Sequence, residues 1–411
     1  MATVILGSGI MGLSTAYYLS QSGSTKPEDI NLVDSSDKLL HCASGFAGGF
    51  LAEDWYAPSV APLGALSFRL HRELAEANDG GKIWGYSTST GISLSQDSEA
   101  AVGGSGEDWL RDGTSRANAA GKEEEEAVDM DGPKWLKRVE GGSLEVITRD
   151  GSNAQIDPLR FCTWLLERCT ERGVKMTYPA KAVGVLKDDD GCLSKLRISK
   201  DGTETTLSCN RLVITAGAWS PRLFNTLFPS SSTKISISQL AGHSLLLKNH
   251  FFNPKDEKEI CHAVFATDTL GFSPEYFSRA GGEVYLAGLN STMIPLPEVA
   301  SDVKVIPAAI KQLKDCAISM MGTVESKEVE VMREALCFRP VTGSGRPIVS
   351  RISDNRLGSG IKTRGGGEGG VFIAGGHGAW GISQGPGTGL CLAELIEGKQ
   401  ISANISALCL P

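Results

Sequence analysis

The N-terminal part of the chain alternates between short apolar runs and one helical pattern. Residues 3–6 and 30–33 are apolar runs of four, and residues 13–20 between them repeat their apolar positions at helical spacing. Short apolar runs bounded by turn residues predict buried strands, and a period near 3.6 residues predicts a helix. The pattern therefore predicts a strand–helix–strand unit at the start of the chain.

The centre of the chain predicts one capped helix among short strands. Asp157 and Pro158 place a carboxylate cap before a helix over 159–172, and Gly173 closes it. Residues 84–95 alternate in the manner of a strand, and further strands are expected at 174–178, 182–187, 193–199, 205–208 and 212–215. Strands mixed with helices favour an α/β fold.

The C-terminal half predicts a second kind of architecture. Three segments alternate polar and apolar residues, which is typical of antiparallel strands; they are 235–247, 260–267 and 283–289. Residues 304–321 form an amphipathic helical pattern. The last strand, at 371–374, is followed by a long glycine-rich loop and a helix over 389–397. We therefore expect an α/β protein with an α+β substrate part, built on an antiparallel sheet.

Length, charge and cysteine content limit the number of domains and the kinds of partner that are expected. The 411 residues are enough for two joined domains, and a net charge of −8 opposes a nucleic-acid partner. No apolar run reaches the roughly 18 residues that span a bilayer, so no integral membrane segment is expected and the cytoplasm is the default location. The ten cysteines form no CxxC pair and no zinc-binding spacing, so reduced thiols and no metal site are expected.

One segment is predicted to be an exposed insertion. Residues 98–133 are rich in glycine, serine and acidic residues, with four consecutive glutamates at 123–126. Runs of like charge repel one another and stay solvated. We expect a flexible acidic insertion within the substrate part of the chain.

A glycine motif between the first strand and the first helix predicts a dinucleotide site. Gly7, Gly9 and Gly12 form a GxGxxG pattern, which permits a tight turn, a close approach to a pyrophosphate and close helix packing. The helix N-terminus that follows favours the phosphate charge. Asp34 ends the second strand 22 residues after Gly12, where a carboxylate binds the ribose hydroxyls and disfavours a 2′-phosphate.

Three later glycine segments bear on the choice between FAD and NAD. They lie at 44–49, 215–219 and 375–389, and each follows a strand or precedes a helix. NAD would not require them, whereas several remote backbone contacts favour one extended ligand. FAD is therefore the expected cofactor, and an NAD dehydrogenase is an alternative.

In order along the chain, these motifs resemble those of the D-amino-acid oxidase superfamily of FAD-dependent oxidoreductases, in particular its glycine oxidase and sarcosine oxidase branch. The resemblance covers nearly the whole chain and rests on residues 7–12, 44–49, 157–158, 215–219, 337–348 and 375–389. It implies a Rossmann-like FAD-binding domain and a substrate domain whose antiparallel sheet covers the flavin. The implied FAD-binding domain comprises residues 1–80, 150–232 and 336–411, and the substrate domain comprises residues 81–149 and 233–335.

The resemblance also implies which residues hold FAD. The segment from Ala43 to Phe50 would pass along the pyrophosphate and the ring, and the region around Val183 would meet the adenine. Noncovalent binding is expected, with a covalent link through Cys337 as the alternative, because sarcosine oxidases link a cysteine at this position. The expected cofactor-binding residues are Gly7, Gly9, Ile10, Met11, Gly12, Asp34, Ser35, Ser44, Ala47, Gly48, Gly49, Val183, Ala216, Gly217, Trp219, Cys337, Gly376, Gly381, Gln384, Gly385, Gly387 and Thr388.

Three residues are candidates for the chemistry itself. Arg339 matches the family arginine that binds the substrate carboxylate, and a guanidinium offers a planar fork matched to both oxygens. His377, flanked by glycines, is expected to contact the flavin or the active site. Trp380 stands where sarcosine oxidases place a second carboxylate-binding lysine. The implied reaction is oxidation of the C–N bond of an amino acid or secondary amine to an imine, by hydride transfer to flavin N5.

The sequence departs from the sarcosine oxidase pattern at the strand above the flavin. Residues 284–288 contain no lysine, although sarcosine oxidases place one there to speed oxygen reduction. The site therefore resembles glycine oxidase more than sarcosine oxidase. O2 is the expected acceptor, giving H2O2, and a flavin dehydrogenase with another acceptor is an alternative. A flavin-binding protein with a regulatory or partner-binding role, for example in trafficking, is a further alternative; substrate, chirality and oligomeric state are left open.

Overall fold

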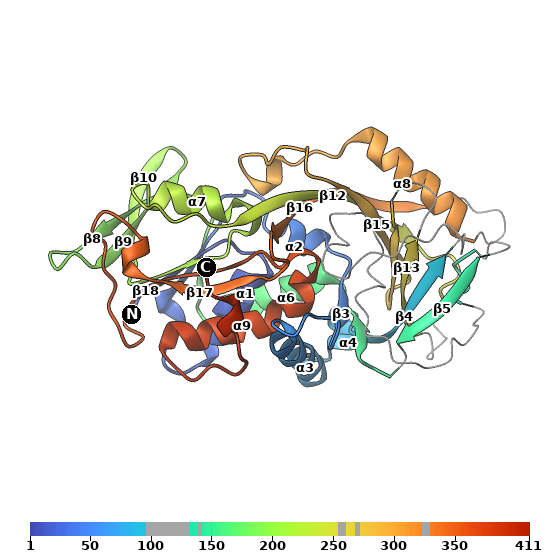
Figure 1. Ribbon diagram of the computed structural model, residues 1–411, viewed down its shortest axis with the longest axis horizontal. Helices are drawn as coiled ribbons and strands as arrows, with labels where there is room; N and C mark the ends of the chain where they lie inside the picture. The colour runs from blue at the N-terminus through green and yellow to red at the C-terminus, as the bar shows by residue number, and fades with distance from the viewer. Residues whose placement is uncertain (96–131, 138–141, 149, 254–259, 268–271, 323–328) are drawn as a thin grey trace.

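Three sheets are formed by the residues that the structure, a computed structural model, describes: 1–95, 132–137, 142–148, 150–253, 260–267, 272–322 and 329–411 (Figure 1). The first, here called the central sheet, has six strands in the order β17-β18-β11-β1-β2-β7. Neighbouring strands are parallel, except for the antiparallel pair β17 and β18. The strands are β1 (Thr3–Leu6), β2 (Ile30–Val33), β7 (Lys175–Thr177), β11 (Arg211–Ile214), β17 (Ile348–Ile352) and β18 (Gly370–Gly375).

Both faces of the central sheet are covered, as the fully buried strand β1 shows. Ile5 belongs to a core shared with helices, whereas Val4 and Leu6 belong to a second core on the opposite face. The helices of the first core are α1 (Ile10–Gln21), α3 (Ala61–Ala77), α6 (Pro158–Glu171) and α9 (Gly381–Glu397). The second core is closed by the small sheet, β8 (Lys181–Lys187), β9 (Leu193–Lys200) and β10 (Thr203–Ser208), and by α7 (Ser220–Leu227).

The third sheet, here called the wide sheet, has nine strands and forms the other half of the molecule (Figure 1). Its order is β16-β12-β15-β14-β13-β4-β6-β3, and β5 pairs with β4. The strands are β3 (Phe50–Ala52), β4 (Ser87–Ser95), β5 (Ser143–Thr148), β6 (Asn153–Gln155), β12 (Ile237–Lys248), β13 (Cys261–Thr267), β14 (Glu275–Arg279), β15 (Glu283–Ser291) and β16 (Val331–Thr342). The long strands β12 and β16 reach from the wide sheet towards the central sheet (Figure 1).

Three further helices complete the described part of the chain. Helix α8 (Pro307–Met320) buries Ile310, Leu313 and Met320 against one face of the wide sheet. The other two are short: α2 (Ala43–Phe46) and α4 (Gly80–Ile83). No helix among the described residues is long and apolar enough to cross a membrane.

The structure confirms the expected fold class, a Rossmann-like α/β part joined to a second sheet, and corrects several elements. The glycine-rich stretch expected as a loop before residue 389 is the first half of α9, which begins at Gly381. The segment at 43–49 contains the helical turn α2. Strand β13 is antiparallel to β14 but parallel to β4, so the wide sheet is not wholly antiparallel.

Two expectations about organisation stay predictions, namely the division into two domains and the acidic insertion. The expected boundary between residues 335 and 336 falls inside the continuous strand β16. Nearly all of the acidic insertion, including the glutamates at 123–126, lies outside the described residues.

Candidate active site

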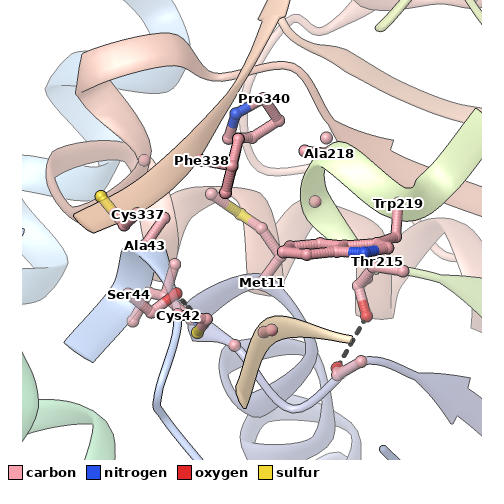
Figure 2. A pocket seen from close by; sticks show the side chains of 18 of the residues that line it. Met11, Cys42, Ala43, Ser44, Thr215, Ala218, Trp219, Cys337, Phe338 and Pro340 are labelled. Carbon is pink, nitrogen blue, oxygen red and sulfur yellow. Dashed lines mark hydrogen bonds between the residues drawn. The ribbon is translucent and has the colours of Figure 1, made fainter. Parts of the chain in front are cut away.

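A cavity of about 380 Å³ is lined by residues of both the central sheet and the wide sheet. It collects most of the residues that the sequence marks for cofactor or substrate: Gly7, Gly9, Ile10, Met11, Asp34, Ser35, Ser44, Ala47, Gly48, Gly49, Val183, Ala216, Gly217, Trp219, Cys337, Arg339, His377 and Gly381. Seven others are not part of its wall: Gly12, Gly376, Trp380, Gln384, Gly385, Gly387 and Thr388. Figure 2 shows part of this wall, with Met11 near the middle, Ser44 and Cys337 at the left, Trp219 at the right, and Phe338 and Pro340 above.

The glycine motif makes room for a ligand and for its own helix. Gly7 has φ +105°, and a Cβ there would lie 2.7 Å from the carbonyl oxygen of Thr215. At Gly12 a Cβ would lie 2.0 Å from the carbonyl oxygen of Gly7, so this glycine serves helix packing and not the cavity wall. The backbone N–H of Ile10 donates to Ser44 Oγ at 2.9 Å, which ties the start of α1 to α2.

Asp34 is held rigidly at the end of β2. Its Oδ2 accepts from the backbone N–H of Ser8 at 2.9 Å and from Ser8 Oγ at 2.6 Å, and its Oδ1 accepts from the N–H of Ser36 at 2.9 Å. The carboxylate lies in the cavity wall beside Ser35 and Ser36. Each carboxylate oxygen can accept further hydrogen bonds, so this position suits a pair of ribose hydroxyls.

Arg279 of β14 fixes the glycine segment that follows α2. Its Nη2 donates to the carbonyl oxygens of Ala47 at 3.0 Å and Gly48 at 3.3 Å, and its Nη1 pairs with Asp157 at 3.2 Å. Asp157 in turn caps α6 by accepting from the N–H of Arg160. Sequence reasoning missed Arg279, although the capping aspartate that it pairs with was identified.

Residues 296–300, here called the strap, contribute to the cavity wall. Glu298, Val299 and Ala300 line the cavity, as do residues 180–183. Trp219 Nε1 donates to the carbonyl oxygen of Pro297 at 2.9 Å. Glu298 pairs with Lys181 at 3.3 Å and with Arg222 at 3.1 Å, so the strap is tied to both flanks of the site.

Arg339 occupies the wide-sheet side of the cavity. Its Nη1 donates to Asn290 Oδ1 at 2.6 Å, and a Cβ at Gly242 would lie 2.0 Å from the same nitrogen. Burial alone would lower the pKa of Arg339. The neighbouring Cys337 and Tyr285 outweigh this effect, so the pKa is raised. The guanidinium is therefore a fixed positive charge that Gly242 leaves room for and Asn290 orients.

His377 is buried and neutral. Its Nε2 lies 3.0 Å from Thr388 Oγ1 of α9, and burial lowers its pKa to about 3. Thr388 thus acts through this contact and not from the cavity wall. Since the imidazole carries no charge at neutral pH, it contributes shape and hydrogen bonding there.

Several C-terminal glycines pack helices together and lie away from the cavity. A Cβ at Gly385 would lie 2.5 Å from the Ile10 side chain of α1, and one at Gly387 would lie 2.8 Å from the Ser67 side chain of α3. Gln384 is buried in the same helix, and Gly376 abuts Thr342. By contrast, Gly381 lies in the cavity wall, so α9 presents its N-terminus and positive dipole end to the site.

An aromatic cluster borders the wide-sheet side of the cavity. The rings of Phe277 and Tyr285 are stacked at 5.9 Å, and those of Phe50 and Phe277 at 5.7 Å. Trp380 contacts the cluster through Phe50 at 6.3 Å and is edge-on to Tyr56 at 4.9 Å. Phe50, Phe277 and Tyr285 themselves line the cavity. Phe50 ends the segment that the sequence places along the flavin, whereas sequence reasoning missed Phe277 and Tyr285.

A scan against family models matches residues 2–395 to DAO, described as FAD dependent oxidoreductase. The chain belongs to this FAD-dependent oxidoreductase family. Curated relatives of the DAO chain include C1F5.03c of Schizosaccharomyces pombe, which is named as an oxidoreductase, with 27% identity over 98% of this chain and 96% of the relative. The uncharacterized oxidoreductase YurR of Bacillus subtilis is 22% identical over 98% of this chain and 96% of its own.

Solved structures show the same fold over the whole DAO chain. Glycine oxidase from Geobacillus kaustophilus has a TM-score of 0.71 and 18% identity, covering 100% of this chain and 98% of that chain. Iminodiacetate oxidase from Chelativorans sp. BNC1 has a TM-score of 0.69 and 16% identity, covering 99% and 98%. L-proline dehydrogenase from P. horikoshii has a TM-score of 0.70 and 14% identity, covering 99% and 96%.

The cavity of this DAO-family chain fits the FAD that its family uses. Gly9 and Gly48 line the cavity, so the bare backbone forms part of the wall that a ligand would meet. A side chain at either position would also meet a neighbour in the protein, since a Cβ would lie 2.9 Å from Ser44 Oγ at Gly9 and 2.4 Å from the ring of Phe277 at Gly48. The wall is continuous from Asp34 through the glycine motif to Cys337. Among the described residues, no group of three or more His, Cys, Asp or Glu side chains is placed to hold a metal ion.

Proposed function

We propose that this chain oxidises the C–N bond of an amino acid or secondary amine to an imine, with Arg339 binding the substrate carboxylate. The observation that carries the proposal is the guanidinium of Arg339, which lines the cavity and is oriented by Asn290. A planar, permanently charged fork is suited to binding both oxygens of a carboxylate. The relatives of known activity add support, because glycine oxidase and L-proline dehydrogenase share this fold.

The role of the protein in this reaction is orientation and charge placement. Bound FAD supplies the two-electron acceptor for a hydride that leaves the substrate carbon. Arg339 fixes the carboxylate end, and Phe277 and Tyr285 form an apolar wall beside it, so the carbon is held in one orientation and water is excluded. The positive end of α9 at Gly381 favours negative charge at that part of the cavity.

No side-chain base is required by this mechanism. Burial keeps His377 neutral by lowering its pKa to about 3, and burial raises the pKa of Tyr285. The substrate therefore reacts as its neutral amine. Loss of two electrons and two protons from the amine gives the imine, and O2 that gains them becomes H2O2.

We propose noncovalent FAD. A link through Cys337 needs the thiolate, and burial raises the pKa of this thiol. Cys337 packs with Phe46 and Ala335 in a small apolar cluster, as an inert core thiol does.

We propose O2 as the electron acceptor, and a dehydrogenase reaction is the second candidate. Residues 284–288, on β15 above the cavity, include no lysine. An oxidase and a dehydrogenase are both represented among the solved structures of this fold. The acceptor is therefore a matter for direct measurement.

The test begins with the purified protein loaded with FAD. Flavin absorbance should leave the protein on acid precipitation, and an amino acid or secondary amine should bleach it under anaerobic conditions. Admission of air should then restore the flavin colour and release H2O2. If the colour returns slowly in air but quickly with an artificial electron acceptor, the result supports a dehydrogenase. Arg339→Lys should raise KM for carboxylate substrates by at least about 10-fold, since the bidentate contact is lost.

The matched control is Arg69→Lys, which alters an exposed arginine paired only with Glu73 on α3. It should leave KM unchanged. The proposal of amine oxidation is wrong if no amine from a broad panel reduces the bound flavin. The assignment of Arg339 as the carboxylate-binding residue is wrong if Arg339→Lys and Arg69→Lys have the same KM.

A further inference from the structure

A buried carboxylate faces the same cavity as Arg339. Glu275 of β14 is 8% exposed and is part of the cavity wall. Its cross-strand register partners are Ala287 of β15 and Phe265 of β13. Sequence reasoning did not identify it, because a glutamate in a short strand is expected to face solvent.

Glu275 interacts electrostatically with Arg339 and with Tyr285. The charge of Glu275 contributes to raising the pKa of Arg339 and of Tyr285, so the carboxylate lies within electrostatic reach of both. Arg339 stands on β16 and Glu275 on β14, with β12 and β15 between them in the wide sheet, so the cavity wall carries one cation and one carboxylate on different strands. A ligand that meets both must carry an anionic group and a cationic group.

The reacting nitrogen is a poor partner for Glu275. It must be a neutral amine when the hydride leaves, and a nearby carboxylate would stabilise its protonated form instead. A second nitrogen, remote from the reacting carbon, can stay protonated throughout the reaction. A carboxylate at this place also disfavours substrates with a second negative charge.

The cavity wall next to Glu275 is aromatic and suits an alkyl chain. Phe277 is two residues from Glu275 on the same face of β14, and its ring stacks on Tyr285. Phe50 extends the same aromatic surface. Methylene groups of a substrate side chain can pack on these rings while its terminal nitrogen reaches the carboxylate.

We propose that Glu275 is a specificity residue that binds a second, cationic nitrogen of the substrate, at the end of an alkyl chain. The preferred substrates are then amino acids or secondary amines with a carboxylate, a reacting amine and a terminal ammonium. This inference rests on the proposed amine oxidation for its catalytic meaning, but the binding site that it describes is tested separately.

The binding test uses two ligands that lack the reacting amine. 6-Aminohexanoate carries a carboxylate and a terminal ammonium, and hexanoate carries only the carboxylate. Each is titrated into the FAD-loaded protein, and binding is measured from the change in flavin absorbance or by calorimetry. The wild-type protein should bind 6-aminohexanoate about 10- to 100-fold more tightly, as expected for a charge-assisted hydrogen bond in a buried site.

Glu275→Gln keeps the shape of the side chain and removes its charge, so the two ligands should then bind within about threefold of each other. Glu334→Gln is the matched control, because Glu334 lies on β16 of the same sheet, pairs with Lys314 and is half-exposed. It should keep the wild-type preference. Equal binding of both ligands by the wild-type protein overturns the inference even if no variant folds.

Turnover gives the second measurement and separates the two proposals. Anaerobic flavin reduction is compared for lysine and norleucine, in both enantiomers, and for iminodiacetate. Faster reduction by the cationic substrate, lost in Glu275→Gln, supports the inference. If amines reduce the flavin with no preference for a cationic substrate, amine oxidation is supported and the role of Glu275 is refuted. If 6-aminohexanoate binds more tightly than hexanoate but no amine reduces the flavin, the proposed oxidation is refuted and the cation site is supported.

Discussion

Replacing Arg279 with methionine removes a buried cation that joins the wide sheet to the cofactor segment. Its side chain is 2% exposed and lies 3.2 Å from Asp157 and 3.7 Å from Glu283. It also donates to the carbonyl oxygens of Ala47 and Gly48. Methionine has a similar reach and no charge, so the substitution tests the polar contacts with little change in packed volume.

The expected loss of stability depends on which hydrogen bonds the partners of Arg279 keep after the substitution. Breaking a buried ion pair by removing one side costs about 3–5 kcal/mol. Here Asp157 is 13% exposed and still accepts from Arg160, and the Gly48 carbonyl keeps its bond from Gln155, whereas Ala47 loses the donor described above. The lower end of the range applies, so the free energy of unfolding should fall by about 3 kcal/mol.

The assay is urea denaturation of the FAD-free and the FAD-loaded protein, followed by circular dichroism. Arg69→Met is the matched control, because Arg69 pairs with Glu73 on the exposed face of α3, where such a pair contributes about 0.3–0.5 kcal/mol. Arg279→Met should also weaken FAD binding, since the Ala47–Gly48 backbone lines the cavity. A loss below about 1 kcal/mol, or one equal to that of Arg69→Met, would refute the assignment of Arg279 as the anchor of this segment.

Three further substitutions test other parts of the site. Gly242→Ala places a Cβ within 2.0 Å of Arg339 Nη1, so KM for carboxylate substrates should rise about 10-fold while the melting temperature changes little. Trp219→Phe removes the donor to the Pro297 carbonyl and should speed FAD release about fivefold, measured as fluorescence recovery on dilution. Burial lowers the pKa of His71 from 6.5 to about 4, so below pH 6.5 the unfolded chain binds a proton that the folded chain refuses. Stability should therefore fall by about 2 kcal/mol between pH 7 and pH 5 from this group, and His71→Gln should make the acid limb of a denaturation series shallower.

The nucleotide end of the site could be predicted because its signal is local. Gly7, Gly9, Gly12 and Asp34 lie within one strand–helix–strand unit, so their spacing can be recognised along the sequence. The structure brings all of them except Gly12 into the cavity wall. The fold class followed from the same kind of short-range pattern.

The start of α9 could not be predicted, because tertiary packing overrides local preference there. A stretch with glycines at 381, 385, 387 and 389 and Pro386 has a low intrinsic helix propensity. Yet the absence of side chains lets the helix approach α1 and α3 closely: a Cβ at Gly389 would lie 2.4 Å from the Ser14 side chain. The helix is stabilised by a contact that only the folded chain contains.

Strand β14 was missed because its charged residues face the cavity and not solvent. Glu275, Phe277 and Arg279 alternate along five residues, so all three point to one face of the wide sheet. A polar–apolar pattern assigns charged residues to solvent, but this face meets the cofactor cavity. The charges are satisfied there by groups from distant segments, such as Asp157 for Arg279.

The register of β14 therefore sets several properties of the site together. Phe277 pairs with Tyr285 of β15, which places Arg279 over the glycine segment and Glu275 in the cavity wall. A shift of one residue would exchange this face for the one that carries Tyr276, now packed in the core beneath α8. Cofactor positioning and the proposed substrate selection are thus coupled through one strand, so a substitution that loosens β14 should weaken FAD binding and charge preference in parallel, whereas Glu275→Gln should change charge preference alone.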